Sequence, residues 1–567
     1  MNMRIGGLAS GMDIDQLVSD LIRAERTKVD KVYQERTLAS WQQEAYQEVN
    51  RVFANFILDS KKELGLTRTT SSGTLLSSGV SSLDWVKAAT LSNGGIASVQ
   101  ASAEAVAGSY QLQVHQLASN WSAASGSAIS TGAKDNLATQ FGLNAETDIL
   151  NFTITTNLGE LTIYKEKEDL SNVTINDLVK EINAANIGVT AMYDAQLDRF
   201  FLQTKNTGSN NTLQITDESV LTDGRKFLTG SENILNLQYL DDAGVSHDVA
   251  DAAVYSGKDA LLDFGAAKGI TQSSNNFMLN NVNITLKATG AATLEVATNV
   301  EGIIAKVSDF VEKYNAFIDK INGELGEERY KDYRPLTDEQ RDQLSEKQEE
   351  QWEEKAKSGL LRNDEILVRT LNTVRVGLYE EVSGVVGSFA HLTELGITTE
   401  SYARGSRGGK LQINTAKLTE AINKDPEGVL ELLFKKPDDS LALKNESSLT
   451  PEQIREKRSQ SGIITRLYDN LIAGMKDVIH KAGPGSDGDL HRNVSSNILL
   501  DFVVEHGSIS KIDKWIGDFT DKIKRLEDIL LQREDRYWRQ FTAMEKAIQM
   551  MNEQSLWLSQ QFGGGGF

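Results

Sequence analysis

The chain of 567 residues is long enough for about three or four domains with buried cores, and its composition is that of a folded protein. Its formal net charge of -21 argues against binding nucleic acid or an anionic membrane, because such surfaces need clustered lysine and arginine. The absence of cysteine excludes disulfides and thiolate catalysis, and we find neither an apolar signal region nor an apolar run long enough to span a bilayer.

The first predicted helix begins after Asp13, a residue that can cap it with Gln16 three positions on, and it ends near Leu64 and Gly65. Its apolar residues follow helical spacing but are interrupted by polar ones. We call this stripe the amino-terminal seam. Its residues are Leu17, Leu21, Val29, Val32, Trp41, Val49, Val52 and Phe56.

The middle of the chain changes to a composition typical of β structure. Only Asp84, Lys87 and Glu104 are charged between residues 69 and 133, and apolar and polar residues alternate over 97–101 and 110–114, as in half-buried strands. Residues 152–202 predict a small α+β module with a helix over 175–185 that a capping box would start. A second β stretch is predicted over 277–296, and 203–276 shows few distinct elements.

Helical pattern returns at residue 298 with an amphipathic stretch that extends to Leu325. Residues 324–357 then carry interleaved charges and predict a solvated helical insertion that Pro335 interrupts. Further helical faces are expected over 366–378, 429–434 and 463–481, with a short strand at 410–413. Residues 483–507 mix glycine, proline and polar residues with one apolar run.

The last predicted helix runs from Ile509 to Phe562 and continues into the glycine tail from Gly563 to Gly566. At about 1.5 Å per residue it would be roughly 80 Å long, too long for one compact core to cover. Its apolar residues recur at alternating spacings of three and four, which is a coiled-coil pattern, with a stutter near Arg533. We call this stripe the carboxy-terminal seam. Its residues are Ile509, Ile512, Ile516, Phe519, Ile523, Leu526, Leu530, Tyr537, Phe541, Met544, Ile548, Met551 and Leu558.

Apolar stripes at helical spacing usually belong to a core, but the length and terminal position of this one favour an interface between subunits over an intramolecular core. A chain with helices at both ends and sheet in the middle can go up one leg, build a head and return. The sequence therefore predicts an α+β multidomain fold, with a helical leg formed by the terminal helices and a head rich in antiparallel β structure.

Candidate catalytic and cofactor motifs are weak. Residues Gly483 to Gly488 spell G-x-G-x-x-G, but they follow a helix and include Pro484, so we predict a turn. Asp487, Asp489 and His491 could contact a cation, although acidic surface loops are common. Carboxylates are too numerous to single out an acid and base pair. We expect no enzyme activity, no cofactor and no metal.

Several motifs in chain order resemble the family of flagellar filament cap proteins, also called hook-associated protein 2. The resemblance spans the whole chain, and its most specific part lies near the C-terminus. The residues that carry it are Gly7-Leu8-Ala9-Ser10-Gly11-Met12-Asp13, Trp41, Glu44-Ala45-Tyr46, Gly108-Ser109-Tyr110, Phe310-Val311, Tyr314-Asn315, Gly359-Leu360-Leu361-Arg362-Asn363-Asp364, Leu395-Gly396-Ile397, Arg536-Tyr537, Gln540-Phe541-Thr542-Ala543-Met544-Glu545, Met551-Asn552, Gln554-Ser555 and Trp557-Leu558.

This resemblance implies a secreted, non-enzymatic assembly factor that forms a homo-oligomeric ring at the distal tip of the flagellum and promotes flagellin polymerisation for motility. Its implied partners are further copies of itself, flagellin, hook-filament junction proteins and a cytoplasmic export chaperone on the last helix. Export would proceed without a cleaved signal peptide.

The resemblance also implies a domain organisation. Residues 1–45 and 525–567 would be terminal coiled-coil segments, mobile in the free subunit; 46–68 and 298–524 a helical leg domain with the charged insertion 324–357; 69–115 and 265–297 an inner β head domain; and 116–264 an outer α+β head domain.

Two alternatives remain open at this stage. A surface or flagellar-tip adhesin would bind host glycan or mucin through exposed head aromatics such as Trp121 and Tyr239. A carbohydrate-cleaving enzyme would need an acidic pair that faces a cleft.

Overall fold

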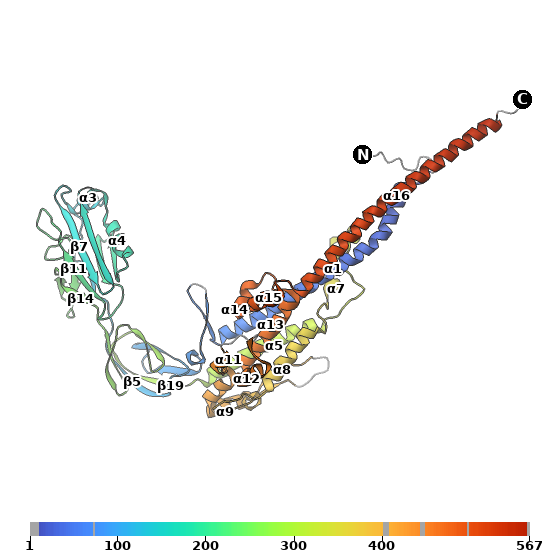
Figure 1. Cartoon of the computed structure of the whole chain (residues 1–567). Coiled ribbons are helices and arrows are strands. Elements are labelled where there is room, and N and C mark those ends of the chain that lie inside the picture. The colour runs from blue at the N-terminus through green and yellow to red at the C-terminus, as the bar shows by residue number, and fades with distance from the viewer. Residues whose placement is uncertain (1–10, 72–73, 401–406, 443–447, 496–497, 564–567) are drawn as a thin grey trace. The chain divides into compact units, whose positions relative to one another are not determined.

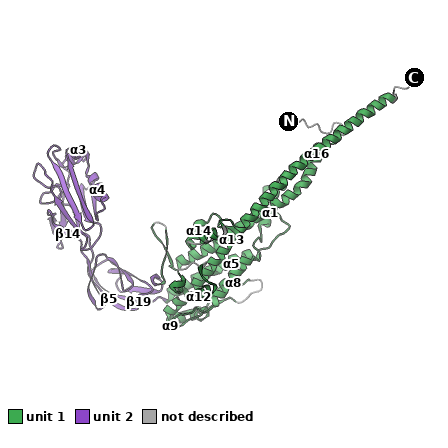
Figure 2. Cartoon of the chain, in the orientation of Figure 1, with its two compact units in different colours: residues 1–80, 300–567 green, residues 81–299 purple. Residues whose placement is uncertain are grey.

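The computed structural model describes residues 11–71, 74–400, 407–442, 448–495 and 498–563 (Figure 1). Gly7 to Ser10 of the first motif, the side chain of Phe562 and the end of the glycine tail lie outside the described residues. The chain divides into two compact units, a helical unit of residues 1–80 and 300–567 and a β-rich unit of residues 81–299 (Figure 2). The chain therefore leaves the helical unit and returns to it, and the predicted α+β class is confirmed.

The helical unit begins with α1, a single helix from Ile14 to Glu63. The carboxylate of Asp13 accepts a hydrogen bond from the backbone N–H of Gln16 at 3.0 Å, and Leu64 is the C-cap, as the sequence predicts. The other elements of this unit are β1 (Thr67–Thr69), β2 (Leu75–Ser77), α5 (Val300–Gly326), α6 (Asp338–Arg341), α7 (Glu346–Lys357), α8 (Glu365–Tyr379), β20 (Ile397–Thr399), β21 (Leu411–Ile413), α9 (Thr415–Lys424), α10 (Pro426–Phe434), α11 (Asp439–Ala442), α12 (Pro451–Gln460), α13 (Ile463–Ala482), α14 (Gly488–Val494), α15 (Ile498–His506) and α16 (Lys511–Gly563).

The second half of α1 is embedded in a helical core. Phe53 and Phe56 both contact the ring of Phe317 on α5, at centroid distances of 5.3 and 4.8 Å. The hydroxyl of Tyr468 on α13 bonds the hydroxyl of Ser60 at 2.9 Å, and both residues are buried. These aromatic and polar contacts anchor the C-terminal half of α1 between α5 and α13.

The β-rich unit contains two separate hydrophobic cores. The inner core lies in the sheets β16-β15-β5-β19-β3 and β17-β18-β4, and the outer core lies in the sheets β13-β12-β6-β10-β9 and β14-β11-β7-β8 with helix α4. The elements are β3 (Lys87–Leu91), β4 (Ala97–Ala101), β5 (Gly108–Gln116), β6 (Ser122–Ser125), α2 (Leu137–Phe141), β7 (Ile149–Thr156), β8 (Gly159–Glu166), α3 (Glu168–Asn172), α4 (Ile175–Ala184), β9 (Val189–Asp194), β10 (Arg199–Thr204), β11 (Thr212–Asp217), β12 (Leu237–Leu240), β13 (Ser246–Asp248), β14 (Val254–Ser256), β15 (Ala260–Phe264), β16 (Ala267–Gln272), β17 (Asn276–Leu279), β18 (Val282–Leu286) and β19 (Gly290–Thr298).

The predicted strands at 97–101 and 110–114 and the predicted helix at 175–185 are present as β4, β5 and α4, and all strand pairs named above are antiparallel. Thr174 and Asp177 form the expected capping box. Residues 203–276, where the sequence shows few elements, form six strands from β11 to β16. Three of them, β12 to β14, are only three or four residues long, too short for alternation to reveal them.

The cores do not follow the predicted domain limits at every point. Residues Ala260, Leu262 and Phe264 of β15 pack in the inner core, whereas the expected boundary assigns them to the outer domain. The four-part domain organisation therefore stays a prediction.

Candidate functional site: the paired terminal helices

The two long terminal helices lie side by side and antiparallel (Figure 1). Val29 and Val32 of α1 form a small buried cluster with Ile523 of α16, and Phe519, Leu526 and Leu530 pack against it. The first half of the carboxy-terminal seam therefore has a partner within the same chain. This seam was predicted as an interface between subunits or with a filament. Over this stretch, however, α1 of the same chain covers its apolar side chains.

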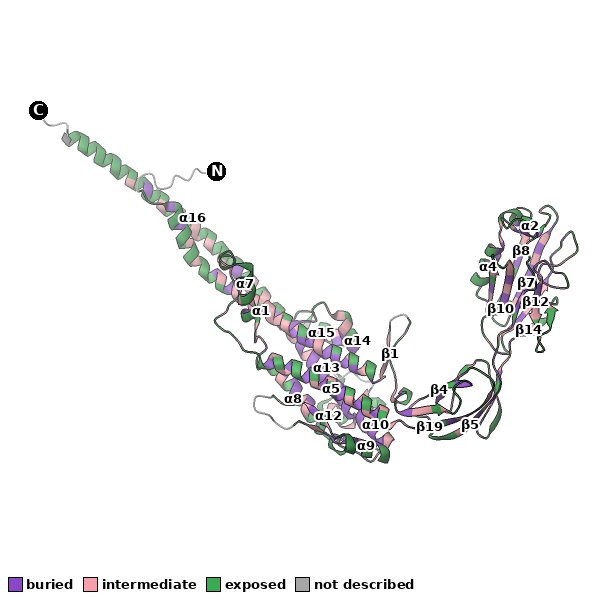
Figure 3. Cartoon of the chain, turned by 180° about the vertical axis from the view of Figure 1, so that it is seen from behind, coloured by how far each residue is buried: buried purple, intermediate pink, exposed green. Residues whose placement is uncertain are grey.

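The residues of the carboxy-terminal seam become more exposed towards the C-terminal end of α16. Ile512 and Ile523 are buried; Ile516, Phe519, Leu526, Leu530, Tyr537, Phe541 and Ile548 are half-buried; Ile509, Met544, Met551 and Leu558 are exposed. Met551 is 61% exposed, and its neighbours Met550, Leu556 and Trp557 are also exposed. Figure 3 shows this end of α16 exposed along its described length. These side chains leave a large apolar surface in water, which is costly for an isolated subunit.

The amino-terminal seam is only partly in the predicted phase. Val29, Val32, Val49 and Phe56 are buried, and Trp41 and Val52 are half-buried. Leu17 and Leu21 are 37 and 38% exposed, whereas Ile14 and Val18 are each 2% exposed. Within the subunit, Ile14 and Val18 rather than Leu17 and Leu21 are covered over the first two turns, so the place of Leu17 and Leu21 in the seam stays a prediction. The missed signal was the spacing of four from Ile14 to Val18 and to Ile22, which leads to Val29 on the same face.

A charged pair lies within this helix pair. Arg533, which stands in the apolar series of α16 where the stutter is predicted, forms an ion pair with Glu25 of α1. A hydrogen bond from Lys28 and the charge of Arg533 hold the pKa of Glu25 below its ordinary value. A polar pair at a seam position penalises any shift of one helix along the other, so it helps to set the register.

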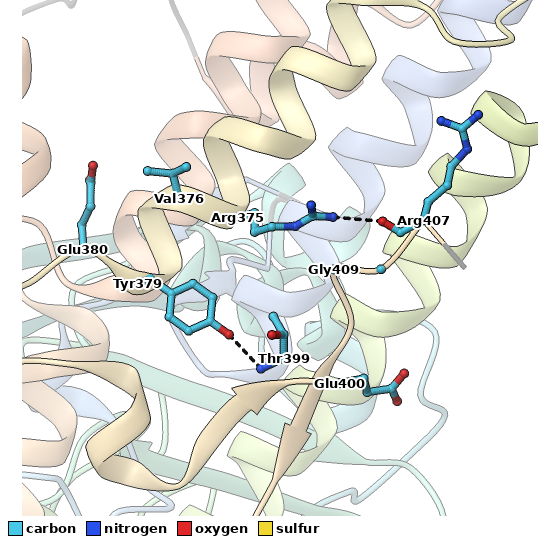
Figure 4. A pocket seen from close by; sticks show the side chains of 9 residues that line it. Arg375, Val376, Tyr379, Glu380, Thr399, Glu400, Arg407 and Gly409 are labelled. Carbon is cyan, nitrogen blue, oxygen red and sulfur yellow. Dashed lines mark hydrogen bonds between the residues drawn. The ribbon is translucent and has the colours of Figure 1, made fainter. Parts of the chain in front are cut away.

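A pocket of about 560 Å³ lies between α8 and the ends of β20 and β21 (Figure 4). Tyr379 accepts a hydrogen bond from the backbone N–H of Thr399 at 2.8 Å, and Arg375 donates to the carbonyl of Arg407. Glu380 and Glu400 both line the pocket, but Figure 4 shows them on opposite sides and pointing in different directions. This arrangement does not form the acidic pair that the glycosidase hypothesis requires.

The candidate cation ligands have other partners. Asp487 binds Arg51 at 2.8 Å, Asp489 binds Arg492 at 2.8 Å, and the side chain of His491 is buried. Within the described ranges, no cluster of three or more histidine or acidic side chains is arranged to hold a metal ion. Gly483 is the C-cap of α13, so the G-x-G-x-x-G segment is a turn after a helix, as predicted.

The aromatic platform that an adhesin would need does not lie open. Trp121 is 7% exposed and stacks on Tyr255 at a centroid distance of 4.8 Å, while Tyr239 is half-buried beside them. The adhesin alternative gains no support. No helix in the described part of the chain has the length and apolar character to cross a membrane.

Comparison with known proteins identifies the family. The family model "Flagellar hook-associated protein 2 C-terminus" matches residues 257–553, and the model of the N-terminus matches residues 10–121. Flagellar hook-associated protein 2 of Halalkalibacterium halodurans is 32% identical over 584 residues, which cover 99% of this chain and 100% of that protein. This chain belongs to the flagellar hook-associated protein 2 family.

Two further proteins are less similar to this chain than that relative. Flagellar hook-associated protein 2 of Thermotoga maritima is 24% identical, with 69% of this chain and 53% of that protein covered. The crystal structure of the D1-D2-D3 domains of the flagellar cap protein FliD from Escherichia coli aligns with a TM-score of 0.43 and 19% identity, covering 78% of this chain and 95% of that one. The cap protein motifs in the sequence thus led to the correct family.

Proposed function

We propose that this protein caps the distal end of the bacterial flagellar filament and promotes the polymerisation of flagellin there. The observation that carries the proposal is the similarity to a flagellar hook-associated protein 2 over 99% of this chain and the whole of that relative. A likeness that covers both chains end to end includes the terminal helices as well as the head.

The division of α16 into a paired and an unpaired part supports this function. Residues from Phe519 to Arg533 contact α1, whereas Met551 and Leu558 expose 61 and 46% of their surface. Burying each such side chain is worth roughly 1.5 to 3 kcal/mol, so docking this end into a filament or a neighbouring subunit would be favourable. We propose that the end of α16 is the filament-facing part of the subunit.

The partners follow from the same proposal. The subunit assembles with copies of itself in a ring, contacts flagellin and hook-filament junction proteins, and is exported without signal cleavage to the filament tip. A cytoplasmic chaperone covers the apolar end of α16 before export, because that surface would otherwise favour aggregation. The protein acts as a structural factor and has no enzymatic role.

The test is complementation of a strain that lacks the coding sequence. We expect the deletion to give short or absent filaments and to release unpolymerised flagellin into the medium, and we expect the full chain to restore filaments. Normal filaments and motility in the deletion strain would refute the cap function.

A second test asks whether the exposed apolar residues at the C-terminal end of α16 are needed for capping. The double variant Met551→Asp, Leu558→Asp places charge on exposed apolar positions and should fail to restore filaments, although the subunit still folds. The matched control Gln549→Asp, Gln554→Asp places equal charge on exposed polar positions of the same turns and should restore them. Equal restoration by both variants would show that this apolar surface is not needed for capping.

A further inference from the structure

The charged insertion forms a small folded unit of its own. Arg329 donates hydrogen bonds to the carbonyls of Ala356 and Ser358, at 2.6 and 2.9 Å, and so ties the start of the insertion to the end of α7. The indole of Trp352 donates to the carbonyl of Arg334 at 2.7 Å, and its ring contacts Tyr333. These bonds close the insertion into a loop with a defined shape, although most of its charged side chains are solvated.

This loop lies against α1 (Figure 1). Gln34 of α1 donates to the carbonyl of Pro335 at 2.8 Å, and the ammonium of Lys357 lies 4.9 Å from the ring centre of Trp41. Pro335 and Leu336 are buried, so the insertion is packed where its carbonyl meets Gln34. An exposed ion pair between Arg23 and Glu339 extends it, but such pairs contribute little.

Burial along α1 changes where the insertion contacts it. From residue 14 to residue 33 the helix buries only Ile14, Val18, Val29 and Val32, and the two valines at 29 and 32 pack against Ile523 of α16. From residue 34 to residue 43 no side chain is exposed, on any face of the helix. Because α16 can cover only one face, the remaining cover over 34–43 comes from other elements, and the insertion supplies contacts at both ends of this stretch.

We propose that the insertion is a strap that fixes α1 at residues 34–43 and so sets the point at which separation of α1 from α16 stops. Residues 14–33 contact α16, and the insertion reaches them only through the exposed ion pair of Arg23 with Glu339, so they can part from α16 as a unit. Residues 34–43 stay with the bundle because the strap contacts them at Gln34 and Trp41. Its use in docking the terminal helices rests on the proposed function, but the strap itself is a property of the folded subunit.

Amide hydrogen exchange of the intact purified chain, followed by mass spectrometry, tests the strap. In the unchanged protein, peptides from 34–43 should exchange as slowly as those from 44–63 and more slowly than those from 14–33. Trp352→Ala should speed exchange over 34–43 by about tenfold or more, and Gln34→Ala by roughly threefold to tenfold, since one hydrogen bond is lost. Exchange over 44–63 should not change.

The controls are Gln351→Ala, an exposed neighbour of Trp352, and Lys31→Ala, an exposed residue one turn before Gln34. Both should leave exchange over 34–43 unchanged. If Trp352→Ala merely unfolds α7, Gln34→Ala decides alone, because alanine favours the helix and removes only the strap contact. Exchange over 34–43 as fast as over 14–33 in the unchanged protein, or no acceleration in Gln34→Ala, would overturn the proposal. Neither result depends on whether the protein caps filaments.

Discussion

The guanidinium of Arg466 is fully buried in the helical unit, and it offers the most quantitative test of the fold. It donates to the carbonyls of Gly377, Glu380 and Glu381 at the end of α8 and of Arg458, Ser459 and Ser461 at the end of α12, at distances from 2.7 to 3.3 Å. The carboxylate of Glu380 lies 3.8 Å away but is 55% exposed. The C-termini of two helices, each carrying about half a negative charge, therefore compensate one buried positive charge.

Substituting Arg466→Met keeps much of the side-chain volume but removes every donor. Each hydrogen bond from a charged group contributes about 1.5 to 3 kcal/mol, and several carbonyls would be left buried without a partner. The loss is partly offset because a charge no longer has to be buried. We expect a net destabilisation of about 4 kcal/mol, near the upper end for a single substitution. Arg466→Lys keeps the charge but gathers its donors on one nitrogen, so we expect about half of this effect.

Scanning calorimetry of the full chain measures the effect. The transition of the helical unit should fall by roughly 10 °C in Arg466→Met, while the transition of the β-rich unit stays in place. Arg455→Met, which removes an exposed arginine from α12, serves as the control and should leave both transitions unchanged. A shift below about 2 °C in Arg466→Met would refute the idea that the two helix ends depend on this cation.

Three further predictions address the pH response, a helix cap and the last helix. Burial lowers the pKa of His491 from its ordinary value of 6.5, so the unfolded state binds the proton more readily than the folded state. The contribution of this group to the free energy of unfolding should therefore be complete above pH 6.5 and decline below it. The difference in the free energy of urea unfolding between pH 8 and pH 5 should be smaller in His491→Gln than in the unchanged protein. The hydrogen bond from the hydroxyl of Thr174 is the main cause that lowers the pKa of Asp177 to about 2. Thr174→Ala should return this pKa towards 3.8 in an NMR titration. An unchanged pKa would show that the hydroxyl does not bond the Asp177 carboxylate at the start of the helix. Ending the chain after Ile548 should leave the melting temperature of the helical unit unchanged, because the described residues beyond it are exposed, and a clear fall would show that they pack on the subunit.

Much of the local structure could be predicted because its causes are local. Asp13 with Gln16, and Thr174 with Asp177, start helices by bonds within four residues, and the structure contains both caps. The spacing of apolar residues from Ile512 to Leu530 is regular enough to place one face of α16 against a partner. The motifs near the C-terminus likewise led to the family, since they are short runs of residues in a fixed order.

Where two sets of residues have equivalent local patterns, only the tertiary structure showed which set is buried. Both Ile14 with Val18 and Leu17 with Leu21 are apolar pairs spaced by four, and only the folded structure shows that the first pair is the buried one. Arg466 looks like any surface arginine until two helix ends, far apart in the sequence, converge on it. The charged insertion has the composition of a solvated helix, yet its backbone carbonyl at Pro335 and the ammonium of Lys357 contact Gln34 and Trp41 of α1. In each case the deciding energy comes from contacts between distant segments, which local spacing does not encode.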